Sequence, residues 1–127
     1  MLNIVDGPTI PAGESLSDGV DCSAGTIVRI TVPQEFTKAN LTFQVSSDGN
    51  FYNDLYGPDG SEVTLTASPD TGIVVPVVWS QSINWIKFRS GSRKAPVLQK
   101  VDCRFGIAVD VPEAAPAGAS RTGARTP

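Results

Sequence analysis

Histidine is absent from this sequence, and cysteine occurs only twice, at Cys22 and Cys103. Without histidine the chain lacks the commonest general base and the commonest metal ligand of proteins. The serines form no Ser-x-x-Lys pattern that can be placed in a cleft, and the carboxylates are scattered over turn-like segments. We therefore predict that the protein is not an enzyme and uses no metal or other cofactor.

Strongly basic regions and long apolar runs are missing as well. The 127 residues carry 10 Lys and Arg against 13 Asp and Glu, a net charge of -3, so no broad basic surface attracts nucleic acid. No apolar run approaches the roughly 20 residues that span a bilayer, and the N-terminal stretch MLNIVDGPTIPAGES lacks the regions of a signal peptide. We expect neither nucleic acid nor membrane as a partner, and synthesis in the cytoplasm.

What the sequence does contain is repeated alternation of apolar and polar residues with a period of two, typical of β-strands. The predicted strands cover residues 28–32, 41–46, 51–55, 62–66, 73–78, 83–89 and 104–110. Turn signals such as SSDGN, GPDGS and SPDTG separate them, and helical periodicity is confined to a turn or two around residues 34–39. We predict an all-β chain, a two-layer antiparallel β-sandwich of about eight strands, jelly-roll-like.

The composition changes near the C-terminus. A single domain of residues 1–111 fits the length of the chain, whereas residues 112–127 read PEAAPAGASRTGARTP and contain no large apolar side chain. Alone, such a segment buries too little surface to offset its ordering entropy, so we predict a flexible arm. We expect this arm to cross onto a neighbouring subunit through Pro112, Pro116, Arg121 and Arg125.

The segment from Ser47 to Gly60 is rich in Asp, Asn and Gly and suggests either a calcium loop or two tight turns. An EF-hand beginning at Asp48 fails, because Asn53 replaces the required Gly and Asp59 stands where the last Glu belongs. Tight turns fit better, since Pro presets φ and Gly supplies a positive φ. We interpret SSDGN and GPDGS as structural turns.

Four aromatic residues, Tyr52, Tyr56, Trp79 and Trp85, have two competing interpretations. They can form a stacking platform for a sugar ring, or they can fill the edge of the core or a subunit interface. Trp85 alternates in step with Lys87, on the outward side of its predicted strand. We favour the interface and keep glycan contact as the alternative.

The two cysteines each end the tripeptide Val-Asp-Cys, and Cys103 shares the inward parity of Phe105 and Ile107. Because the first and last strands of sandwiches are often neighbours, we predict that Cys22 and Cys103 lie close enough for an intrachain disulfide. Two alternatives stay open. The cysteines are buried and reduced, as a cytoplasmic origin favours, or they pair with another chain.

Many of these strand and turn residues also carry a resemblance. The matching residues are Ile10, Gly13, Ser15, Pro33, Leu41, Thr42, Phe43, Ser47, Asp48, Gly49, Ile86, Phe88, Arg89, Ser90, Gly91, Ala95 and Pro96. In this pattern the chain resembles a small β-sandwich family of structural proteins found in tailed bacteriophages and related particles. The match covers most of residues 8–110 and leaves both the arm and the cysteines outside the pattern.

The resemblance implies architecture and virion context more than mechanism, since similar domains are structural proteins of the head, neck or tail fibres. We therefore expect a non-enzymatic virion structural protein that decorates the head or forms part of the neck, collar or a fibre. Its partners would be copies of itself and other capsid, neck or fibre subunits, after synthesis in the host cytoplasm. The alternative function is a carbohydrate-binding module that attaches to host surface glycans.

Overall fold

The computed structural model describes residues 2–76 and 84–112, and within these ranges every helix or strand is a β-strand. The strands are β1 (Leu2–Ile10), β2 (Val20–Asp21), β3 (Thr26–Thr31), β4 (Leu41–Ser46), β5 (Asn53–Asp54), β6 (Gly72–Val74), β7 (Trp85–Ser90) and β8 (Cys103–Asp110). No helix in the described part of the chain is long and apolar enough to cross a membrane.

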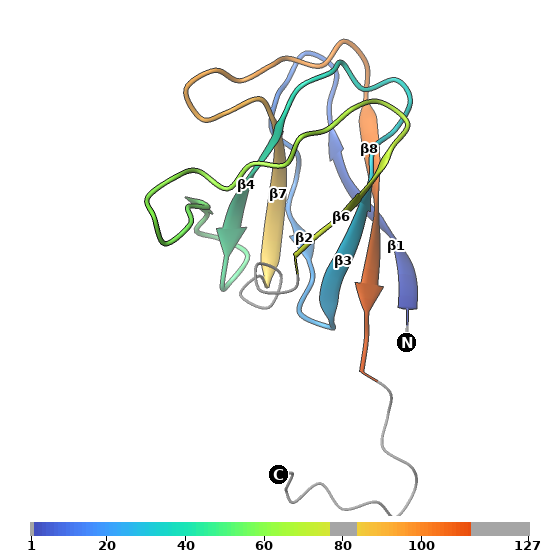
Figure 1. Cartoon of the computed structure of the whole chain (residues 1–127), viewed down its shortest axis with the longest axis vertical. Helices are drawn as coiled ribbons and strands as arrows, with labels where there is room; N and C mark the ends of the chain where they lie inside the picture. The colour runs from blue at the N-terminus through green and yellow to red at the C-terminus, as the bar shows by residue number, and fades with distance from the viewer. Residues whose placement is uncertain (1, 77–83, 113–127) are drawn as a thin grey trace, which may run out of the picture.

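The strands form two antiparallel sheets, drawn side by side in Figure 1. The β8 sheet has the order β1-β8-β3-β6, and the β7 sheet has the order β2-β7-β4-β5. The first strand therefore pairs with the eighth, the second with the seventh, the third with the sixth and the fourth with the fifth. This nested order is that of a jelly roll, and it confirms the predicted two-layer sandwich.

Phenylalanine rings occupy the centre of the space between the sheets. Phe88 of β7 and Phe105 of β8 are fully buried and meet edge to face, with ring centroids 5.2 Å apart. Phe43 packs in the same way on Phe88 at 5.4 Å, and Phe36 on Phe105 at 5.6 Å. Edge-to-face contacts of this kind add about 0.5–1.5 kcal/mol beyond the burial of the rings themselves. The predicted inward residues of these strands therefore form one core.

The first strand was not among the predicted ones. β1 pairs with β8 from Leu2 to Ile10, but its register shifts between Asp6 and Thr9. Gly7 lies within this bulge, where a Cβ would collide with the backbone oxygen of Phe105. The Asp-Gly-Pro sequence required by the bulge interrupts the alternation after four residues, so the period of two is not visible in the sequence.

Other segments also differ from the prediction, since β2 was not expected and the strand expected over residues 73–78 is limited in its described part to Gly72–Val74. The expected strand over residues 62–66 makes only isolated bridges, between Leu41 and Leu65 and between Tyr56 and Glu62. The expected strand over residues 51–55 is reduced to the two residues of β5. The chain over residues 62–66 still contributes to the core, because Val63 and Leu65 are buried and Leu65 exchanges two backbone hydrogen bonds with Leu41 at the start of β4. The region around residues 34–39 forms a turn, not a helix.

Several of the predicted contact residues lie outside the described residues. Trp79 belongs to residues 77–83, and Pro116, Arg121 and Arg125 belong to residues 113–127. Pro112 is described and exposed, directly after β8.

Candidate functional site

The segment from Ser46 to Gly60 follows β4 and returns over the outer face of the β7 sheet. The Asp48 carboxylate accepts hydrogen bonds from the amides of Asn50 at 2.8 Å and Phe51 at 3.1 Å, and from the Ser46 hydroxyl at 2.9 Å. These bonds, the one from Asn50 foremost, lower the pKa of Asp48. Gly49 has a φ of 81°. The geometry is that of a tight turn, and it occupies the carboxylate with its own backbone.

Arg89 is a buried charged residue on this face, and its ion pairs had no signal in the sequence. It lies on the outward side of β7, yet its side chain is only 8% exposed. The guanidinium donates to Asp54 at 2.9 Å, to Glu62 at 2.8 Å and to the Thr42 hydroxyl at 3.0 Å. Arg93 adds an ion pair with Asp54 at 3.1 Å. Two arginines and two carboxylates thus form a closed cluster that ties the loop after β5 to the sheet.

The predicted aromatic residues do not form one platform. The Lys87 ammonium lies 4.4 Å from the centre of the Tyr52 ring, and the Tyr52 hydroxyl reaches the Cα of Gly19 closely enough to exclude a side chain there. The Trp85 ring lies against Gly49. Tyr56 is separate from this group, because its hydroxyl interacts with Arg93.

Phe51 was not singled out in the sequence, yet it is the most exposed aromatic side chain of the described residues, at 80%. It follows the turn at Asp48, and its neighbour Tyr52 lies on the sheet. The pattern in the sequence offered no signal for this, because Phe51 was read as the beginning of a strand.

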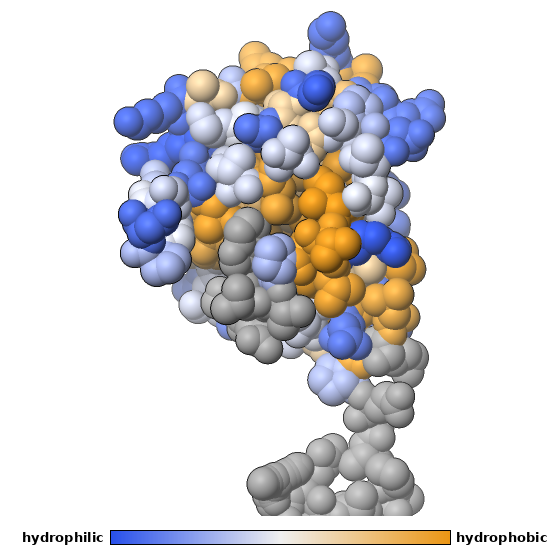
Figure 2. All heavy atoms as spheres, in the orientation of Figure 1, coloured by the Kyte–Doolittle hydropathy of each residue, from blue (hydrophilic) through white to orange (hydrophobic). Residues whose placement is uncertain are grey.

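Exposed apolar side chains concentrate on β1, at one edge of the β8 sheet. Leu2 is 55% exposed and Ile4 66%, both on the outer face, while Val5 is 41% exposed on the inner side. Ala108 of β8 lies opposite Ile4 and keeps this face flat. Figure 2 shows hydrophobic residues near the lower end of β1 as well as across the middle of the same view. An apolar surface of this kind is typical of a contact with another molecule.

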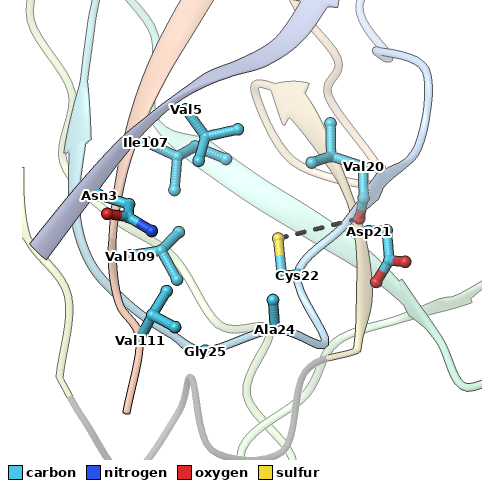
Figure 3. A pocket seen from close by; sticks show the side chains of 10 residues that line it. All are labelled: Asn3, Val5, Val20, Asp21, Cys22, Ala24, Gly25, Ile107, Val109 and Val111. Carbon is cyan, nitrogen blue, oxygen red and sulfur yellow. Dashed lines mark hydrogen bonds between the residues drawn. The ribbon is translucent and has the colours of Figure 1, made fainter. Parts of the chain in front are cut away.

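A pocket of about 100 Å³ opens between the inner side of β1 and the chain after β2 (Figure 3). Val5, Ile107 and Val109 line one side, and Val20 and Cys22 line the other. Ligand sites for small molecules usually measure about 300–1,000 Å³, so this pocket suits one apolar side chain at most. It is an extension of the apolar surface of β1.

The structure places the two cysteines apart, and both are free and buried. Cys103 begins β8 and pairs with Ile10, whereas Cys22 lines the pocket beside Val109, near the other end of β8. About six residues of extended strand, roughly 20 Å, separate the two ends. The first and last strands are indeed neighbours, but the first is β1, and Cys22 follows β2 in the other sheet.

The burial of the thiols determines their chemistry. Burial raises the pKa of Cys22 to about 11, and the negative charge of Asp21 adds to this effect. Burial also raises the pKa of Cys103, whose thiol lies 3.3 Å from Oε1 of Gln99. A nucleophilic or metal-binding cysteine needs the thiolate form, which these surroundings disfavour. Among residues 2–76 and 84–112, no three His, Cys, Asp or Glu side chains converge on a possible metal position.

We expect Arg89→Ala to lower the free energy of unfolding by about 3 kcal/mol or more, because it leaves Asp54 and Glu62 partly buried without their main counter-ion. The matched control is Arg104→Ala. Arg104 pairs with Asp6 at 3.9 Å on an exposed surface, so its loss should cost less than about 0.5 kcal/mol. Urea denaturation of both variants measures the difference. Equal losses would show that the cluster does not stabilise the fold.

We expect the stability of the protein to fall as the pH rises from about 9 to about 11. The unfolded Cys22 loses its proton near the ordinary pKa of 9.0, whereas the folded residue keeps it until about 11, so alkaline pH favours unfolding. Denaturation at pH 8 and pH 10.5 should show this loss, and Cys22→Ala should reduce it. An equal loss in the Cys22→Ala variant would contradict the role of Cys22.

Comparison with known proteins gives no relative, since no family model, no curated protein and no solved structure matches the chain.

Proposed function

We propose that the protein is a non-enzymatic structural subunit that works by binding other protein subunits. The observation that carries the proposal is the exposed apolar edge of β1, where Leu2 and Ile4 are more than half exposed. Soluble proteins usually protect an edge strand with charges, proline or a bulge. β1 has such protection only from Asp6 onward, so within residues 2–76 and 84–112 no strand covers the outer edge of Leu2–Val5.

We propose further that the assembly is the virion of a tailed phage, with this chain as a head-decoration, neck or fibre component. The resemblance over residues 8–110 supports this context, and jelly rolls are common in viral capsid domains. A fold by itself does not define a function, so the edge of β1 carries the argument and the fold adds the setting. The arm from Pro112 onward would add a second contact, because its composition supplies no core of its own.

We expect mass spectrometry to detect the chain in purified particles of the phage that encodes it. An Ile4→Lys variant should be incorporated at least tenfold less, because a charge on the apolar edge opposes burial. Val74→Lys is the matched control, since Val74 is 79% exposed on the opposite edge of the same sheet. Absence of the chain from the particles would contradict the virion assignment. Normal incorporation of Ile4→Lys would contradict the role of the β1 edge.

A second candidate function is attachment to surface glycans. The specific observation is that Tyr52 and Trp85 border the same turn on the outer face of the β7 sheet, next to the exposed Phe51. Aromatic rings held beside polar groups are the usual components of a sugar-binding surface. Jelly rolls also occur among lectins.

If glycan attachment is the function, a glycan array should show binding that Tyr52→Ala and Trp85→Ala abolish. Tyr56→Ala is the control, because Tyr56 belongs to the separate group around Arg93. Host adsorption by particles carrying the same variants extends the test to the assembled state. An array without binding, together with unchanged adsorption by the Tyr52→Ala and Trp85→Ala particles, would remove this candidate.

A further inference from the structure

We infer that the open edge of β1 pairs with β1 of a second copy, which joins two β8 sheets into one antiparallel sheet across a two-fold axis. The inference rests on the proposed function, because it names the partner of the same edge. It commits to a second copy of this chain as the occupant.

The first argument is the shape of the edge. Within the described residues β1 pairs only with β8, so one side of the strand faces outward with its backbone N–H and C=O groups. The bulge between Asp6 and Thr9 and the missing N–H of Pro8 end this edge. The part of β1 that is straight and free to pair with another strand is therefore limited to Leu2–Asp6. A partner strand can thus pair with no more than these five residues.

The second argument is self-complementarity. Two antiparallel copies of one strand that are related by a two-fold axis present the same groups to each other. A single apolar sequence therefore supplies both halves of the interface. The segment Leu2–Val5 contains no charge, and an acidic or basic partner would find no counter-ion there. A second copy places apolar side chains opposite apolar side chains.

The third argument fixes the register. In the preferred register Asn3 lies opposite Asn3 of the second copy. Leu2 of each chain then lies opposite Ile4 of the other, so that two Leu2–Ile4 pairs bury four exposed apolar side chains on the outer face. The paired segment then excludes Asp6, and the two Asp6 carboxylates lie about 20 Å apart, beyond the screening length of about 8–10 Å. If the two-fold axis moves by one residue, the pairing is centred on Ile4 and each Asp6 lies opposite Leu2 of the other chain. This register is unfavourable because it places a charged side chain against an apolar one.

Cysteine cross-linking tests both the pairing and the register. Directly opposed residues of antiparallel strands have Cα atoms about 4.5–5.5 Å apart, which permits a disulfide. We expect Asn3→Cys to form a disulfide-linked dimer under mild oxidation, at least tenfold more than Ile4→Cys or Val5→Cys. Val74→Cys, on the other edge of the sheet, should form none, and neither should the native chain, whose two cysteines are buried.

Sedimentation of the full chain without added cysteines provides the second measurement. We expect a dimer that Ile4→Lys converts to a monomer and that Val74→Lys leaves intact. Cross-linking of Val74→Cys equal to that of Asn3→Cys would overturn the pairing, and preferential cross-linking of Ile4→Cys would overturn the register. A monomer at all concentrations, without cross-links, would overturn the inference. The proposed function would still stand in that case if Ile4→Lys prevented incorporation into particles.

Discussion

The contact between Phe88 of β7 and Phe105 of β8 joins the middle of one sheet to the middle of the other. Both side chains are fully buried, and both strands have neighbours on each side within their sheets. Once these two rings face each other, the period of two along each strand decides which residues point inward. Contacts are then left to the outward residues and to the open edges of the sheets, so the core determines the position of every candidate surface.

The outer faces of the two sheets differ in their charged and apolar residues. On the β7 sheet, Arg89 binds Asp54 of β5 and Glu62 after it, and these ion pairs hold that part of the chain against the sheet. On the β8 sheet, no comparable ion-pair cluster occurs among the described residues, and Leu2 and Ile4 stay exposed beside the small Ala108. This asymmetry is why we locate the contact with a partner on β1 and regard the polar cluster as structural.

The parts of the fold that could be predicted are those whose signal is local. Strands β4 and β8 were predicted because their alternation is unbroken, whereas β1 was missed because its bulge places Asp-Gly-Pro inside the strand. The burial of Arg89 depends on carboxylates 35 and 27 residues away in the sequence, and no spacing rule brings them together. The exposure of Ile4 depends on which strand has no second neighbour, which only the topology reveals.

The cysteines illustrate the same limit. The rule that the first and last strands are neighbours was correct, but it was applied to the segment around Cys22 because β1 had not been predicted. One missed strand therefore brought Cys22 next to Cys103 in the prediction, whereas the structure places it near the other end of β8. The choice between the two possible functions could not be predicted for a different reason. The contact surface of an assembled protein depends on a partner that the sequence of one chain does not contain.

Amide hydrogen exchange of the native chain at low and high protein concentration tests the central claim about β1 most directly. Exchange is slowed where an amide becomes hydrogen-bonded to a partner strand. The account predicts that high concentration slows exchange within Leu2–Val5 at least tenfold and leaves Gly72–Val74 of β6, at the other edge of the same sheet, unchanged. Equal exchange of the β1 segment at both concentrations, or equal slowing of both edges, would contradict it.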